Sequence, residues 1–270
     1  MTRLIAAFWL AASLAAGGAC AQPFPFNDAG VTMGHLHLNS RDVEANKKIL
    51  VAMGGVAMKP GDFELVQFPG VVVNLHLRPG SAPPSAGPTD GTLVNHVGFI
   101  VQNVQESIAR WKALGVPVHS GNNNRLDQAY VTTPDGLRIE ILEDKNQKHP
   151  IQHEHVHFFL PEDALAPSQA WYAKVFGAKP GVRNNAPVAD VPGAQLRFAK
   201  TDKPMITTRG RILDHIGFDV KDLPAFIKTL EAQGIKLDRP YTKNEKTGDA
   251  LAFITDPWGV YIELNERHPQ

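Results

Sequence analysis

The chain has 270 residues, enough for one large domain or two ordinary domains with their own cores. Lysine plus arginine and aspartate plus glutamate both number 27, so the formal net charge is zero, and neither nucleic acid nor an anionic membrane surface is an expected partner. The single cysteine excludes a disulfide framework within the chain.

The first 21 residues have the pattern of a secretory signal peptide. Arg3 is followed by an apolar stretch from Leu4 to Ala16 and then by small residues ending in Ala19-Cys20-Ala21, an A-x-A cleavage site. The apolar stretch is too short for a typical membrane-spanning helix, although an uncleaved anchor and a lipidated Cys20 are alternatives. We therefore predict export to the periplasm or the extracellular space, with no membrane attachment after cleavage.

Four strand-like segments each carry a histidine, and each is followed by a polar turn and a helix-like stretch. The segments are MGHLHLNS, VNHVGFIV, HEHVHFFL and LDHIGFDV, with His35, His96, His155 and His215. In VQESIARWKALG, which follows the second segment, apolar residues recur at helical spacing and Gly115 is a plausible stop. Short apolar or alternating runs between glycine and proline turns come next. Each module is therefore predicted to run strand, helix and about three strands, over residues 31–78, 92–144, 151–200 and 211–267.

The two halves of the chain match each other in spacing. Residues recur at separations of 120, 119 and 123 in the pairs His35 and His155, His96 and His215, and Glu140 and Glu263. The segment YVTTPDGLRIEI likewise parallels FITDPWGVYIEL. This repetition indicates a duplicated unit of two modules. We expect two domains, residues 31–144 and 151–267, joined by the polar linker 143–152.

These motifs resemble the vicinal oxygen chelate superfamily, which includes glyoxalase I, extradiol dioxygenases, methylmalonyl-CoA epimerase, fosfomycin-inactivating transferases and bleomycin-binding proteins. The resemblance rests on the histidine of each opening strand, the helix endings WYAKVFGA and WKALG, and the module endings TPDGLRIEIL and DPWGVYIEL. It implies an α+β fold of four βαβββ modules paired into two incomplete β-barrels. It also implies a divalent metal inside the barrel, a small-molecule substrate, and a monomer or homodimer.

The resemblance places metal ligands on the opening and closing strands of the modules. The implied sites are His35, His96 and Glu140 in the first domain, and His155, His215 and Glu263 in the second, which is the preferred one. Two neutral imidazoles and one carboxylate leave a charge of +1 on a divalent ion and open positions for water and substrate oxygens. This set does not distinguish Fe, Mn, Zn and Ni. Asn74 and Arg197, at the equivalent closing positions of the first and third modules, are poor ligands, so three-ligand sites are expected.

A second histidine follows in two of the opening strands. Because residues i and i+2 of a strand share a face, His37 and His157 are expected to point into the same cavities as His35 and His155. They are candidate catalytic bases, and a structural role is the alternative. Glycine is expected to cut back the facing wall, at positions 98 and 217. The remaining histidines are interpreted as surface residues: His76, His119, His149, His153 and His268. The loops at 122–125 and 242–249 are interpreted as solvated.

Three functions remain open. The favoured one is a metal-dependent lyase, isomerase or transferase of the glyoxalase type, which stabilises an oxyanion or enolate on a small oxygen-bearing substrate. The second is an extradiol-type ring-cleaving dioxygenase using Fe(II) or Mn(II). Tyr130 fits the tyrosine before the closing turn in that family, but Phe253 stands there in the second half. The third is a non-catalytic binder of the bleomycin-resistance type, disfavoured because such proteins generally lack the metal residues. Export argues against glutathione- or CoA-linked chemistry.

Overall fold

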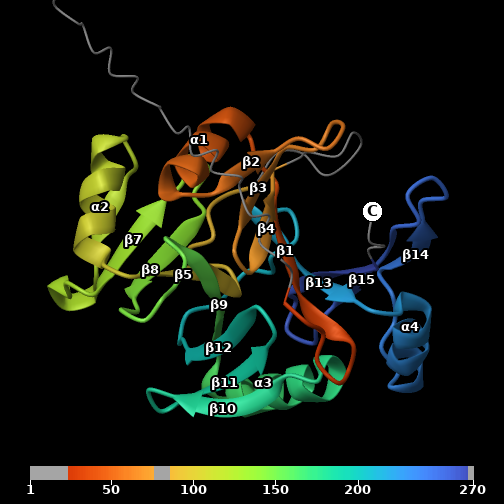
Figure 1. The fold of residues 1–270 in the computed structure, drawn as a ribbon. Helices are drawn as coiled ribbons and strands as arrows, with labels where there is room; N and C mark the ends of the chain where they lie inside the picture. Colours follow the sequence, from red (N-terminus) through yellow and green to blue (C-terminus); the bar gives the residue numbers. More distant parts are fainter. Residues whose placement is uncertain (1–23, 76–85, 267–270) are drawn as a thin grey trace, which may run out of the picture.

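The structure is a computed structural model that describes residues 24–75 and 86–266. The expected signal peptide, His76 and His268 lie outside these residues. The described chain folds into four consecutive modules, each with one strand, one helix and three further strands (Figure 1). The α+β class and the βαβββ order expected from the sequence are confirmed.

The modules have the following elements. The first contains β1 (Val31–Leu38), α1 (Val43–Met53), β2 (Val56–Met58), β3 (Leu65–Phe68) and β4 (Val71–Asn74). The second contains β5 (Val94–Val101), α2 (Val104–Ala113), β6 (Val118–Ser120), a 3-10 turn (Asn122–Asn124), β7 (Gln128–Thr132) and β8 (Arg138–Glu143). The third contains β9 (Gln152–Leu160), α3 (Glu162–Phe176), β10 (Lys179–Arg183), β11 (Ala186–Val191) and β12 (Ala194–Lys200). The fourth contains β13 (Leu213–Val220), α4 (Leu223–Ala232), β14 (Arg239–Lys243), β15 (Ala250–Thr255) and β16 (Tyr261–Glu266).

The helices begin and end where the sequence provides caps. The side chains of Asp42, Asn103 and Asp222 accept hydrogen bonds from the first-turn backbone of α1, α2 and α4. Gly54 follows α1 with φ +116°, a conformation that favours glycine. Each helix buries one face against the sheets, and in α2 the side chain of Trp111 is completely buried.

The strands form two eight-stranded sheets that curl into incomplete barrels. One sheet has the order β14-β15-β16-β13-β1-β4-β3-β2 and therefore joins the fourth module to the first. The other has the order β10-β11-β12-β9-β5-β8-β7-β6 and joins the third module to the second. At the centre of each sheet two opening strands run antiparallel, β1 beside β13 and β5 beside β9 (Figure 1).

This pairing differs from the expected one, in which the first module pairs with the second and the third with the fourth. In either arrangement an H-x-H opening strand faces an H-x-G opening strand, so strand complementarity does not choose between them. Residues 86–93, the described part of the segment between the first two modules, favour the observed pairing because they contact the residues that lead into the fourth module. There the amide of Ile212 donates to the Gly87 carbonyl (3.1 Å) and the amide of Leu93 donates to the Ile206 carbonyl (2.9 Å).

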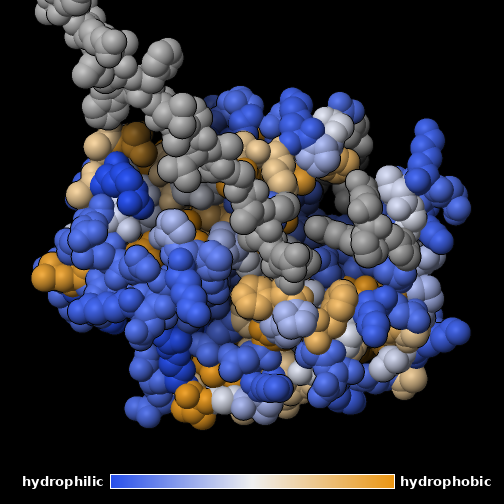
Figure 2. All heavy atoms as spheres, viewed as in Figure 1, coloured by the Kyte–Doolittle hydropathy of each residue, from blue (hydrophilic) through white to orange (hydrophobic). Residues whose placement is uncertain are grey.

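The surface is mostly hydrophilic on the face that Figure 2 shows, with apolar residues in separate small patches. Within the described residues, no helix is both long enough and apolar enough to cross a membrane.

Hydrogen bonds also tie the two barrels together. The carboxylate of Asp135, in the turn before β8, accepts from the Ser40 hydroxyl (2.9 Å), the Asn46 side chain (2.6 Å) and the amides of Arg41 and Asp42 (2.6 and 3.1 Å). Burial raises the pKa of this carboxyl, but the hydrogen bonds outweigh it and hold the pKa below its ordinary value of 3.8. Asp135 thus anchors the entry to α1 from the other barrel.

Replacing Asp135 with asparagine is expected to lower the free energy of unfolding by about 1–2 kcal/mol at neutral pH, because charged hydrogen bonds at a helix entry are lost. Since the folded pKa lies below the unfolded one, the stabilisation is present above about pH 4 and is lost as the pH falls through the folded pKa. Urea unfolding at pH 7 and pH 3 measures both effects. A difference between the two proteins that stays the same at both pH values would contradict this account.

Candidate metal centres

The structure brings histidines and a glutamate together in the interior of each barrel. Site A, in the barrel of the first and fourth modules, consists of His35, His37, His215 and Glu263. Site B, in the barrel of the second and third modules, consists of His96, Glu140, His155 and His157. Within each group, one nitrogen or oxygen atom per residue lies within 4.8 Å of all the others.

In site A the two central strands and β16 supply the side chains. The Nε2 atom of His215 lies 2.7 Å from Glu263 Oε2, and the Nε2 atom of His35 lies 3.5 Å from the same oxygen. The ring of His37 stacks on His215 with the centroids 4.4 Å apart. All four residues are buried. Two imidazole nitrogens therefore converge on one carboxylate oxygen, and a third imidazole stands beside them.

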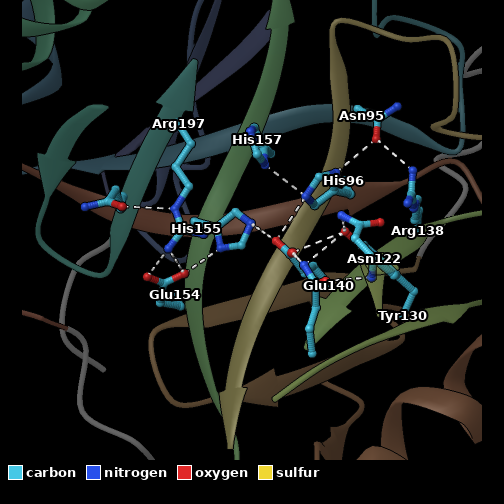
Figure 3. Close-up of polar contacts among 12 residues, drawn as sticks. Asn95, His96, Asn122, Tyr130, Arg138, Glu140, Glu154, His155, His157 and Arg197 are labelled. Carbon is cyan, nitrogen blue, oxygen red and sulfur yellow. Dashed lines mark hydrogen bonds and ion pairs between the residues drawn. The ribbon is translucent and has the colours of Figure 1, made fainter. Parts of the chain in front are cut away.

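Site B repeats this arrangement (Figure 3). The Nε2 atoms of His96 and His155 lie 3.3 and 3.1 Å from Glu140 Oε2. The Nδ1 atom of His157 lies 3.0 Å from His96 Nε2. The alternation of side chains along a strand explains both sites, since residues two apart on β1 and on β9 point into the same cluster.

A glycine faces one histidine in each site. Gly217 pairs with His35 across β13 and β1, and Gly98 pairs with His155 across β5 and β9. A β-carbon at Gly217 would lie 2.0 Å from the His35 ring, and one at Gly98 would lie 1.8 Å from the His155 ring. Only glycine leaves room for these imidazoles, and the glycine wall expected from the sequence is present.

The histidines are oriented by hydrogen bonds from their other ring nitrogen. His215 Nδ1 donates to Asp214 Oδ1 (2.6 Å), and His96 Nδ1 donates to Asn95 Oδ1 (2.9 Å). His155 Nδ1 donates to the half-buried carboxylate of Glu154 (2.5 Å). These bonds place a hydrogen on Nδ1 and direct Nε2 at the glutamate, so that Nε2 can bind a metal ion once it carries no proton of its own.

The protonation states differ between the sites. In site B, burial lowers the pKa of His96 to about 4 and that of His157 to about 2, so both rings are neutral at pH 7. In site A, burial also acts to lower the pKa of His215, but the hydrogen bonds with Asp214 and Glu263 outweigh it and raise the pKa. Burial acts to raise the pKa of Glu263, yet the hydrogen bonds from His215 and His35 hold it well below its ordinary value.

Replacing Asp214 with asparagine is expected to weaken metal binding at site A about ten- to hundredfold, because an outer carboxylate raises the basicity of the histidine it orients. Asn95 is the counterpart at site B, so Asn95→Asp is the matched variant and is expected to strengthen binding there. Chelator competition with zinc measures both affinities. An Asp214→Asn protein with wild-type affinity would show that this carboxylate does not tune the site.

The six ligand positions named from the sequence all lie in the two clusters, but in a different grouping from the one expected. His155 lies in site B, in the other barrel from His215 and Glu263. His35 likewise lies in site A, apart from His96 and Glu140. The grouping follows from the pairing of the modules, because each opening strand shares a barrel with the strand it pairs with.

Several other residues differ from their expected places. His153, expected at the surface, is buried, and its Nδ1 donates to the Gly193 carbonyl (3.1 Å). His119 is exposed as expected. The loop at 122–125 is largely exposed, yet Asn122 donates from its side chain to the Tyr130 hydroxyl (3.1 Å). That loop therefore supports site B.

Sequence reasoning missed part of the hydrogen-bond network around Glu140. Its Oε1 atom accepts from the Tyr130 hydroxyl (3.2 Å) and from the Gln128 side chain (Figure 3). Tyr130 pairs with Glu140 across β7 and β8, and Gln128 lies two residues earlier on the same face. The polar residues of the Q-x-Y segment were the available signal. Arg197, which was not expected to be a ligand, donates to Glu154 (2.5 Å).

The residues present fit a divalent metal ion. Each cluster combines up to three imidazoles with one carboxylate, a set that suits Zn, Fe, Ni and Mn better than Ca or Mg. In each site a glycine leaves room for one imidazole ring, and a hydrogen-bond acceptor on the preceding residue orients another, that of His215 or His96. The rings are therefore held in place before any ligand binds. A further imidazole, that of His37 or His157, lies beside the three candidate ligands of each site.

Known proteins with a similar sequence segment or a similar structure have the same kind of fold. Residues 144–264 match the family model described as Glyoxalase/Bleomycin resistance protein/Dioxygenase superfamily. Glyoxalase I from Zea mays is similar in structure, with a TM-score of 0.65 and 15% identity over 87% of this chain and 92% of that chain. A "putative dioxygenase" from Bacillus subtilis has a TM-score of 0.63 and 13% identity over 88% of this chain and 86% of that chain. At these identities the similarity shows the fold alone. Among curated proteins, none matches the chain.

Proposed function

We propose that the chain, whose residues 144–264 match the model of the Glyoxalase/Bleomycin resistance protein/Dioxygenase superfamily, is a divalent-metal-dependent enzyme of the glyoxalase type. Its reaction is a lyase, isomerase or transferase step that stabilises an oxyanion or enolate on a small oxygen-bearing substrate. The observation that carries the proposal is the convergence of three histidines and one glutamate in each barrel.

The metal would be held by His35, His215 and Glu263 in site A, and by His96, His155 and Glu140 in site B. When bound, such an ion acts as a Lewis acid that polarises a substrate carbonyl and stabilises the negative charge that develops on its oxygen. The buried position of these residues supports this role, because electrostatic stabilisation is stronger where water is excluded.

We assign proton transfer to His37 and His157. Each ring has a nitrogen within 4.8 Å of the ligand atoms, close enough to reach a substrate that touches the metal. His37→Asn and His157→Asn are expected to keep the metal and lose proton transfer. Loss of the metal in these variants would make the two histidines ligands instead.

An extradiol-type dioxygenase with Fe(II) or Mn(II) is the second candidate. The observation that favours it is the Tyr130 hydroxyl, which lies 3.2 Å from Glu140 in site B. Site A has Phe253 in the corresponding position beside Glu263, so this candidate applies to site B alone. A non-catalytic small-molecule binder is the third candidate.

One set of measurements separates these functions. Metal analysis of the wild-type protein is expected to give two equivalents, and His215→Ala and His155→Ala are each expected to lose one. Exchange of a proton on a carbon next to a carbonyl, without oxygen uptake, supports the proposed chemistry. Oxygen consumption with catechols by the iron-loaded protein would contradict the proposed chemistry and support the dioxygenase. Tight binding of an aromatic antibiotic, with neither of these activities, would contradict the proposed chemistry and support a non-catalytic binder.

Export also belongs to this proposal, supported by the first 21 residues of the sequence. A mature amino terminus at Gln22 in protein recovered from the periplasm or the medium is the expected result. An intact Met1 in cell-bound protein would contradict export.

A further inference from the structure

We infer that site A receives a substrate with a largely apolar, uncharged body attached to the oxygens that reach the metal, and that site B does not accept such a body. The inference rests on the proposed function, since it names the substrate class of one of the two proposed metal sites.

A cavity of about 740 Å³ opens onto site A, and His35 and Glu263 form part of its lining. This volume lies in the range of cavities that enclose small organic ligands. Apolar side chains from both modules form its walls, namely Phe63, Leu65, Val72 and Leu251. A ligand that reaches the proposed metal would therefore place its body against apolar surface.

The charges around this cavity are few. Among the described residues that line it, Lys243 and Asp249 are the charged ones besides Glu263, and they have opposite signs. A substrate with several phosphates or carboxylates would need several cations to replace its hydration. The cavity is therefore unsuited to polyanionic conjugates, and it suits a body without formal charge.

The strand registers identify the residues of site B that correspond to this lining. Three positions can be matched between the sites. The first pairs with His35 in site A and with His155 in site B, and the second pairs with His37 and with His157. The third lies two residues before the strand partner of Glu263 in site A and of Glu140 in site B. In site A these positions hold, in the same order, Val72, Asn74 and Leu251. In site B they hold Gln195, Arg197 and Gln128.

The site B residues are bonded to one another and to the candidate ligands. Arg197 donates to Gln195 Oε1 (2.9 Å) and to the Glu154 carboxylate behind His155 (Figure 3). Gln128 donates to Glu140, and its own Oε1 accepts from the Asn122 amide (2.8 Å). An apolar body placed there would have to break charged hydrogen bonds, which is costly inside a protein. Two of the corresponding positions in site A impose no such cost, because they hold Val72 and Leu251.

The test uses two hydroxamates with the same pair of oxygens and different tails, acetohydroxamate and octanohydroxamate, on cobalt-loaded protein. Glu140→Gln leaves site A as the working metal site and Glu263→Gln leaves site B, and cobalt analysis confirms one equivalent in each. Dissociation constants come from the visible spectrum of cobalt. A fully buried methylene contributes roughly fourfold in affinity, so burial of only two of the six extra methylenes gives more than about tenfold.

The Glu140→Gln protein is expected to bind octanohydroxamate more than about tenfold more tightly than acetohydroxamate, and the Glu263→Gln protein less than about threefold more tightly. Adding Leu251→Gln to the Glu140→Gln protein is expected to reduce the ratio to about threefold or less. The matched change, Gln128→Leu, is expected to leave the ratio of site A unchanged. A tail preference at site B, or equal preferences at both sites, would overturn the inference while the proposed function stands. A wild-type protein that binds no cobalt would overturn the proposed function itself and the inference with it.

Discussion

Replacing Gly217 with alanine is expected to abolish metal binding at site A and to leave site B loaded. The added β-carbon would lie 2.0 Å from the ring of His35, and the backbone of β13 cannot retreat without breaking its pairing with β1. The imidazole must therefore leave its position beside Glu263. Overpacking of this kind also lowers the free energy of unfolding, typically by about 1–3 kcal/mol. Metal analysis is expected to fall from two equivalents to one.

Two further glycine variants make this result specific. Gly98→Ala is expected to remove the other equivalent, because its β-carbon would lie 1.8 Å from the ring of His155. Gly181→Ala, in β10, is the control, since its β-carbon would lie 3.4 Å from Val188, which is ordinary contact. A Gly217→Ala protein that keeps both ions at wild-type affinity would show that His35 does not need the space that glycine leaves.

Replacing Asp256 with alanine is expected to be among the most destabilising changes in the chain, at about 3–4 kcal/mol. The buried carboxylate accepts from the backbone amides of Trp258, Gly259 and Val260 (3.0, 2.8 and 2.8 Å) and from the Tyr172 hydroxyl (2.9 Å). Because Tyr172 belongs to the third module and Asp256 to the fourth, the change loosens a turn and a contact between the barrels together. Buried donors left without an acceptor cost about 1–3 kcal/mol each, and relaxation of the turn recovers part of that loss.

Urea unfolding measures this effect, with Tyr172→Phe as the matched variant. Tyr172→Phe keeps the three backbone bonds of Asp256 and is expected to cost about 1 kcal/mol. If both variants cost the same, the turn does not depend on the carboxylate, and the explanation given for Asp256 fails.

The modules could be predicted because their signals are local. Asn103 caps α2 and Gly115 follows it with positive φ, so the helix is defined by its own residues. The side of the strand on which the histidines lie could also be predicted, since alternation along β1 puts His35 and His37 on one face.

The pairing of the modules could not be predicted from the same signals. His35 needs a glycine opposite it, and Gly98 and Gly217 satisfy that need equally well in sequence. The choice depends on contacts of the connecting segment, such as that between Gly87 and Ile212, which no periodicity reveals. The partners Asp214 and Glu154 were missed for a related reason. Neighbouring residues on a strand ordinarily point to opposite faces, so alternation alone does not place them beside their histidines.

The most direct measurement of the central claim is the metal content of two double variants. His35→Ala/His215→Ala removes two proposed ligands of the same ion, and His35→Ala/His96→Ala removes one ligand from each of two ions. With circular dichroism confirming that both proteins fold, the first is expected to retain one equivalent and the second none. The reverse result would mean that the modules share their metals in the other pairing, and a wild-type protein that takes up no metal would contradict the account altogether.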